Sequence, residues 1–197
     1  EAVLQRAKAM QAMQDEMEQI AVHPGDSPKG LLRLTSSYSF AEDFLMRQVD
    51  DYLSLQPNVA IDVLVLDRAV NLVEERIDLA IRITNALDPN VIARKLGTCR
   101  SVVCASPEYL KRCGTPRTIA DLATKNCLTY SYFGKSLWQF DSINGPESVP
   151  VSGNLSTNIS SLLLQSTLRG AGISLQPHYS VQKYLQSGKL IALFPEY

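Results

Sequence analysis

Two hydroxyl-rich runs in this chain each come directly before a predicted helix. The first is Thr35–Ser36–Ser37–Tyr38–Ser39, which follows an apolar strand. The second is Ser156–Thr157–Asn158, continued by Ser160–Ser161 before a leucine-rich helix. Free amides at a helix start, with hydroxyls beside them, can hold a carboxylate or another small polar ligand. N-capping of the helix is the alternative role, and we expect one of these residues to serve it.

Nucleophilic catalysis has little support in the residue inventory. The chain has two histidines, His23 and His178, and no Gly-x-Ser-x-Gly turn. His178 follows Pro177 at a predicted strand-to-helix junction, which favours a capping or surface role. The GAGIS sequence at 170–174 lies after a helix and before a strand, the wrong order for a phosphate-binding loop. Gly170 is instead predicted to end that helix in the left-handed conformation.

The cysteines do not have the spacing of a metal site. No Cys-x-x-Cys pair occurs, and two histidines are too few for a zinc cluster. A redox pair of Cys104 and Cys113 is a weaker alternative, because only Lys111 and Arg112 would lower a thiol pKa there. We therefore expect reduced thiols in a cytoplasm, with no metal and no cofactor. The four cysteines are Cys99, Cys104, Cys113 and Cys127.

Strands and helices alternate along the first half of the chain. This order predicts a parallel sheet with right-handed crossovers. Its predicted strands are 30–37, 58–66, 77–83, 91–97 and 101–106, and its predicted helices are 39–56 and 67–76.

A second α/β unit follows. A helix over 106–114 is predicted from Ser106 as N-cap, Pro107 at the first position and Gly114 as stop. Two units of similar length, 31–105 and 106–176, followed by a returning element, are the plan of a two-lobed binding domain. The further predicted strands are 127–130, 137–140, 149–155, 172–177 and 190–194, and the further helices are 118–123, 159–170 and 179–188.

Composition excludes several classes of protein. Of 197 residues, 45% are hydrophobic and 20% charged, which is ordinary globular composition rather than that of a disordered chain. The net charge of −1 argues against a domain that binds nucleic acid through its phosphate groups. The longest apolar runs fall short of the roughly 18 residues that span a bilayer, and no secretory signal is visible.

Residues 1–21 form a predicted helix with a heptad seam. Val3, Met10 and Met17 recur every seven residues, with Met13 and Ile20 in the companion positions. Packing on its own domain is one alternative. We favour a seam against a partner chain, because the HPGDSPKG segment that follows is a linker. The chain opens with Glu1 and is already helical there, so we expect it to be part of a longer protein.

Several blocks of this sequence closely resemble the effector-binding domain of LysR-type transcriptional regulators. They are DLAIR, ASPEYLKRCGTP and GAGISLQPHYSVQKYLQSGKL, and the resemblance covers residues 29–197. It implies an α/β fold of two Rossmann-like lobes joined by a two-strand hinge, like a type 2 periplasmic binding protein. It also implies that the chain stops before the family's last strand and helix. The implied division is linker helix and linker 1–28, lobe I 29–105 with 177–197, and lobe II 106–176, with crossovers near Ala105–Ser106 and Gln176–Pro177.

The resemblance also places an effector cleft between the lobes. Arg68 would either neutralise an anionic effector or pair with Asp67 or Glu75, and the two aromatic residues of lobe II are cleft or core residues. The cleft residues it implies are Ser37, Tyr38, Ser39, Arg68 and Thr84 from lobe I, and Tyr132, Phe133, Asn158 and Ser160 from lobe II.

The resulting hypothesis is a bacterial regulatory domain that senses a small metabolite allosterically. Its expected partners are an effector, further copies in a homodimer or tetramer, DNA through a winged helix-turn-helix outside this chain, and RNA polymerase, but no membrane. We expect self-association through the helix 40–55 and the strand 59–66, with Phe44, Val49 and Tyr52 in the contact. A periplasmic solute-binding protein is the alternative, although it would lack the heptad helix; an enzyme is not expected.

Overall fold

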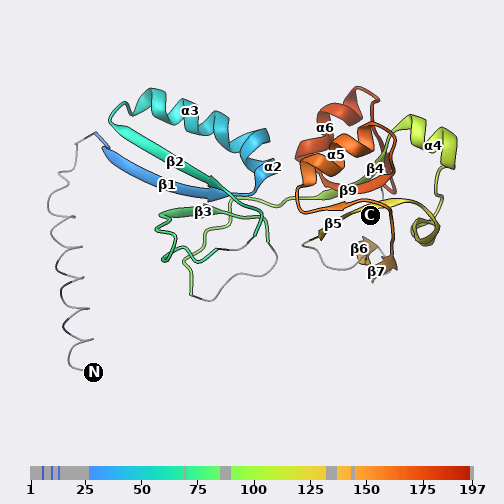
Figure 1. Ribbon diagram of the computed structural model, residues 1–197, viewed down its shortest axis with the longest axis horizontal. Coiled ribbons are helices and arrows are strands. Elements are labelled where there is room, and N and C mark those ends of the chain that lie inside the picture. Colours follow the sequence, from blue (N-terminus) through green and yellow to red (C-terminus); the bar gives the residue numbers. More distant parts are fainter. Residues whose placement is uncertain are drawn as a thin grey trace.

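The computed structural model describes residues 6, 10, 13, 27–68, 70–84, 90–131, 137–142 and 145–195. Two α/β parts lie side by side (Figure 1). We call the part built on a three-stranded sheet, residues 30–84, lobe I, and the part built on a five-stranded sheet, residues 101–195, lobe II. Residues 90–100 connect the two lobes without regular secondary structure.

Lobe I is a parallel sheet of order β2–β1–β3, as the alternating pattern predicts. Its strands are β1 (Gly30–Ser36), β2 (Val59–Val65) and β3 (Leu79–Ile81). One long helix covers a face of this sheet (Figure 1). The helix consists of α2 (Tyr38–Phe40), a π-helical stretch η1 (Ala41–Leu45) and α3 (Met46–Leu55).

The core of lobe I lies between that helix and β1. Leu45 and Val49, four residues apart on one helix face, are buried against Leu34 of β1. The β-branched residues Ile61 and Val63 of β2 pack against the same cluster. This packing sets the direction in which the helix runs from the end of β1.

Two predicted elements of the first unit are absent from the described residues. Residues 67, 68 and 70–76 form bends, irregular chain and a turn rather than a helix. The Asn71 side chain accepts from the amides of Val73 and Glu74, and Arg76 adopts a positive φ of 52°. Val73 is 86% exposed, so no apolar face is buried there. The strand predicted at 91–97 is irregular chain in the structure.

Lobe II contains a mixed sheet of order β10–β4–β9–β5–β8, with β5 parallel to both neighbours and β4 antiparallel to both. Two helices cover one face of the sheet, and a hairpin lies on its other side (Figure 1). The elements are β4 (Ser101–Ala105), α4 (Pro107–Cys113), η2 (Ile119–Thr124), β5 (Cys127–Tyr130), β6 (Leu137–Ser142), β7 (Gly145–Pro150), β8 (Ser156–Thr157), α5 (Ser160–Leu168), β9 (Ile173–Pro177), α6 (His178–Gln186) and β10 (Ile191–Leu193).

The helix boundaries of lobe II follow the predicted signals. Ser106 is the N-cap of α4, and its hydroxyl accepts from the Tyr109 amide at 3.2 Å. Pro107 occupies the first turn, and Gly114 ends the helix with φ 77°. Gly170 follows α5 with φ 78°, so its predicted left-handed conformation is confirmed.

Strands on both sides of the implied crossovers pair in one sheet. β4 and β10 pair with each other, and β4 pairs with β9. The division into lobes at 105–106 and 176–177 stays a prediction. The chain therefore enters lobe II through 90–100, and its sheet continues past Pro177 into β10. The physical reason is apolar packing: Leu193 and Phe194 belong to the lobe II core, where the Phe194 ring meets Phe140 edge to face.

The predicted N-terminal helix lies largely outside the described residues. Arg6, Met10 and Met13 are described, and all three are helical and exposed. Across the described parts of the chain, no helix is both long enough and apolar enough to cross a bilayer.

Candidate functional site

The carboxyl ends of the three parallel strands of lobe I form one edge, and the loops that leave this edge are tied together. The Leu66 amide donates to the Ser36 carbonyl at 2.9 Å, which joins the ends of β1 and β2. The Tyr38 amide, at the start of the long helix, donates to Asp67 Oδ1 at 2.9 Å. Asp67 therefore places a carboxylate at the helix start, where the helix dipole favours negative charge.

A half-buried cation supports the same edge. Arg82, directly after β3, donates through Nη1 to the Leu66 carbonyl and through Nη2 to Thr35 Oγ1 at 2.9 Å. Burial lowers the pKa of its guanidinium, and nearby Asp67 opposes this effect. An arginine nevertheless stays charged at neutral pH. Within the described residues this guanidinium forms no ion pair. Sequence reasoning missed Arg82. The pattern that could have indicated it is a charged residue directly after a short apolar strand.

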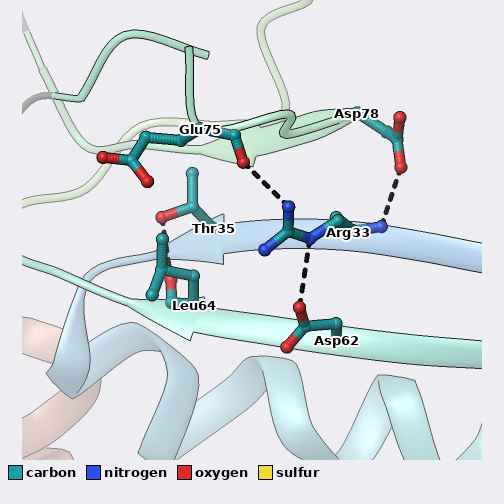
Figure 2. Close-up of polar contacts among 6 residues, drawn as sticks. All are labelled: Arg33, Thr35, Asp62, Leu64, Glu75 and Asp78. Carbon is teal, nitrogen blue, oxygen red and sulfur yellow. Dashed lines mark hydrogen bonds and ion pairs between the residues drawn. The ribbon is translucent and has the colours of Figure 1, made fainter. Parts of the chain in front are cut away.

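A second arginine anchors the connection between β2 and β3 (Figure 2). Arg33 Nε lies 3.1 Å from Asp62 Oδ2 on β2, and Nη1 donates to the Glu75 carbonyl at 3.0 Å. Its amide donates to Asp78 Oδ2 at 2.8 Å. Thr35 Oγ1, on the same strand, donates to the Leu64 carbonyl at 2.8 Å. These bonds join β1 to β2 and to the segment that leads into β3.

The structure brings the predicted lobe I residues to this edge. Ser37 is the N-cap of the long helix, but its side chain makes no capping bond. Tyr38 is exposed, and Ser39 is buried. Arg68 and Thr84 are exposed at the ends of β2 and β3, and Arg68 forms no ion pair with any described residue.

The predicted lobe II residues lie at the start of α5. Ser160 is its first residue, and exposed Asn158 lies two positions earlier. The elements α2 and α5 contact each other across the lobe junction (Figure 1). Tyr132 and Phe133 lie outside the described residues.

Tyr179 of α6 contacts the start of the long helix across the same junction. Its hydroxyl lies 3.1 Å from Ser39 Oγ, and the two share a hydrogen bond. Its ring meets Phe40 edge to face, with centroids 5.9 Å apart. Burial raises the pKa of the Tyr179 phenol, while the bond to Ser39 opposes that rise. The phenol therefore stays protonated and can donate at neutral pH.

Two buried polar atoms near the ends of central strands have no hydrogen-bond partner among the described residues. They are Ser36 Oγ on β1 and Gln176 Oε1 on β9, although Gln176 Nε2 donates to Ser174 Oγ at 3.2 Å. An unpartnered buried acceptor is costly and calls for a ligand or water. Gln176 was not predicted as a site residue, because it lies in a run whose other residues predict a sheet core.

The residues considered for catalysis or redox chemistry have structural roles. Burial raises the pKa of the Cys104 thiol to about 12, which argues against the redox pair with Cys113. His178 begins α6, and its amide donates to the Arg100 carbonyl at 2.9 Å. Among the described residues, no three His, Cys, Asp or Glu side chains gather as metal ligands would.

Comparison with known proteins gives a consistent result. Residues 25–197 match the family model described as the LysR substrate binding domain. The HTH-type transcriptional regulator DmlR of Escherichia coli K12 is 35% identical over 189 residues, which are 94% of this chain and 60% of that protein. The HTH-type transcriptional activator TtdR of the same strain is 31% identical, with 95% and 60% covered. This chain thus spans about 60% of the length of these relatives.

Solved structures show the same fold. The structure of CrgA, a LysR-type transcriptional regulator from Neisseria meningitidis, superposes with a TM-score of 0.78 at 28% identity, covering 96% of this chain and 64% of that one. Its regulatory domain alone gives a TM-score of 0.74 at 27% identity, with 86% and 83% covered. The relatives named here are transcriptional regulators rather than enzymes or transport proteins.

Proposed function

The chain belongs to the LysR substrate-binding domain family, and on that premise we propose that it binds a small-molecule effector between its lobes and so controls transcription through a DNA-binding domain elsewhere in the protein. The observation that carries the proposal is the contact of α2 with α5 across the lobe junction, since each of these helices begins in a hydroxyl-rich run, Ser37–Ser39 and Asn158–Ser160. In α/β sheets, ligands bind beyond the carboxyl ends of strands, and β1, β2 and β3 end at this place.

The proposed effector is a small polar molecule with at least one acceptor group. The Ser39 hydroxyl, the Tyr179 hydroxyl and the Asn158 amide can all donate to it. The Arg82 guanidinium behind Thr35 favours negative charge at this edge, although Asp67 already supplies one carboxylate. The unpartnered Ser36 Oγ and Gln176 Oε1 would serve as further contacts.

Control requires that the effector distinguish two lobe arrangements. A ligand that binds both arrangements equally shifts neither population. In the structure the Ser39–Tyr179 bond closes the junction, so an effector that inserts there must break it. The proposed signal is therefore a change in lobe orientation that the DNA-binding part of the protein follows.

Self-association through lobe I is part of the proposal. β2 is an edge strand of its sheet, and on the adjacent helix Phe44 is 55% and Tyr52 is 40% exposed. Exposed aromatic residues beside a free edge suit a homodimer or tetramer contact. Val49, predicted for the same contact, is instead a buried residue of the lobe I core. Because its relatives regulate transcription, we also propose that the protein acts in the cytoplasm, with DNA and RNA polymerase as partners.

A thermal-shift screen of metabolites tests the proposal. At about 100 times its dissociation constant, a ligand of the folded state stabilises it by about 2.7 kcal/mol. We expect one class of polar metabolite to raise the melting temperature of the chain, and Ser37→Ala and Asn158→Ala to weaken that response. A ligand that stabilises both variants as strongly as the parent would place the site elsewhere.

A further inference from the structure

One carboxylate of lobe I contacts two residues of α6 in lobe II. The Ser180 hydroxyl donates to Asp43 Oδ2 at 2.6 Å, and Lys183 Nζ lies 3.8 Å from Asp43 Oδ1. Ser180 and Lys183 are three residues apart and so share one face of α6. Asp43 lies in the π-helical stretch η1, and such stretches are frequent at functional sites.

These contacts differ in strength. A hydroxyl that donates to a carboxylate forms a short, strong bond, and Ser180 is only 3% exposed while the Asp43 side chain is 23% exposed. The ion pair adds little, because the Lys183 side chain is 64% exposed and water screens it. Ser180 therefore carries most of the contact.

The same region of α6 places Tyr179 at the lobe junction. Tyr179 precedes Ser180 directly, and it contacts Ser39 and Phe40, which lie just before η1. A bond at Ser180 therefore fixes the backbone from which Tyr179 extends. Without the bond between Ser180 and Asp43, the Ser39–Tyr179 bond would be the only hydrogen bond between these two helices among the residues described.

We infer that Asp43 is a positioning residue of the lobe junction: through Ser180 it holds α6, and with it Tyr179, against the start of the long helix. The relevance to ligand binding rests on the proposed function. If an effector binds between the lobes, it can enter only those protein molecules in which this contact is open. The apparent affinity for the effector is then the intrinsic affinity multiplied by the fraction of protein molecules that are open.

Hydrogen exchange on the chain without ligand tests the inference. Asp43→Ala and Ser180→Ala each remove the bond, and Glu42→Ala is the matched control, because Glu42 is an exposed acidic neighbour on the same helix. A hydrogen bond to a charged group is stronger than one between neutral groups, so we expect exchange in 38–44 and 178–184 to be roughly tenfold faster or more in both variants. The control and the amides of β4 and β9 should keep parental rates.

The double variant separates positioning from general destabilisation. If both residues act through one bond, Asp43→Ala with Ser180→Ala exchanges no faster than either single variant. Parental exchange in Asp43→Ala, additive effects in the double variant, or acceleration that extends equally into β4 and β9 would each overturn the inference. No ligand is used, so a failed metabolite screen leaves this result unaffected.

Discussion

Arg82 Nη2 donates to Thr35 Oγ1 at 2.9 Å, so the end of β3 is bonded to the end of β1 at the edge where the lobes meet. The same guanidinium donates to the carbonyl of Leu66, which follows β2. One side chain thereby joins the ends of all three strands of lobe I.

We predict that Arg82→Met lowers the free energy of unfolding by about 1–3 kcal/mol, because the Leu66 carbonyl and Thr35 hydroxyl lose a charged donor. Arg68→Met is the control: Arg68 is exposed without an ion pair among the described residues, and its loss should change stability by less than about 0.5 kcal/mol. Urea denaturation of both variants measures the difference. Equal effects of the two substitutions would contradict the role given to Arg82.

Two serines at N-cap positions should respond differently to alanine. Ser106 accepts from the Tyr109 amide, so Ser106→Ala should cost about 1 kcal/mol of stability. Ser37 makes no capping bond, so Ser37→Ala should cost no more than a few tenths. Thermal and urea unfolding distinguish them. A large loss in Ser37→Ala would mean that its effect in a metabolite screen reports folding rather than binding.

Close backbone packing at Gly153 leaves no room for a side chain. A Cβ at this position would lie 2.0 Å from the Cys127 carbonyl oxygen, so Gly153→Ala must displace β5. We expect a loss of about 1–3 kcal/mol or more. A Cβ at Gly97 meets nothing within 4 Å, and Gly97→Ala should be neutral or slightly stabilising. Calorimetry that finds both variants as stable as the parent would show that β5 can shift freely.

Asp121 should make the free energy of unfolding depend on pH in the acidic range. Its carboxylate accepts from the amides of Arg117 and Thr118, and these bonds hold its pKa below the ordinary 3.8. Because the pKa of Asp121 is lower in the folded state than in the unfolded state, the stabilisation is fully present at a pH above the unfolded-state pKa. It is lost as the pH falls through the folded-state pKa. Asp121→Asn should therefore be less stable than the parent at neutral pH, and the difference should vanish in acid.

Urea titrations from neutral pH to about pH 3 measure that difference. Asp51→Asn is the control, because Asp51 is exposed on α3. A stability gap between Asp121→Asn and the parent that stays constant across this range would show that the amide bonds do not depend on ionisation.

Local patterns predicted most elements of the fold. The β-branched run 59–65, the helix from 38 to 55, and the signals at Ser106, Pro107 and Gly170 act over a few residues, and each is confirmed. The turn at 67–76 was missed because helical spacing of Val70 and Val73 outweighed the Asn71 side chain, which competes for the backbone. The pairing of β10 with β4 was not predicted, because it depends on contacts some 90 residues apart, which no local pattern contains.

The candidate site was accessible to sequence reasoning only in part. Hydroxyls at helix starts predicted Ser37, Ser39 and Asn158 as neighbours of the junction. The bonds of Ser39 to Tyr179 and of Asp43 to Ser180 join residues almost 140 positions apart, and neither spacing nor residue type indicates them.

The π-helical stretch Ala41–Leu45 has a consequence for how this helix tolerates insertions and deletions. A π turn accommodates one residue more than an α turn. Successive residues of an α-helix are about 100° apart around its axis. Deleting one residue there would rewind the segment as a regular α turn through about the same rotation, so Ser39 would still face Tyr179 while Leu45 and Val49 stayed packed on the sheet. A deletion of one residue at this point should therefore leave the contact between the two lobes intact, whereas the same deletion within α3 would turn one side of the helix relative to the other.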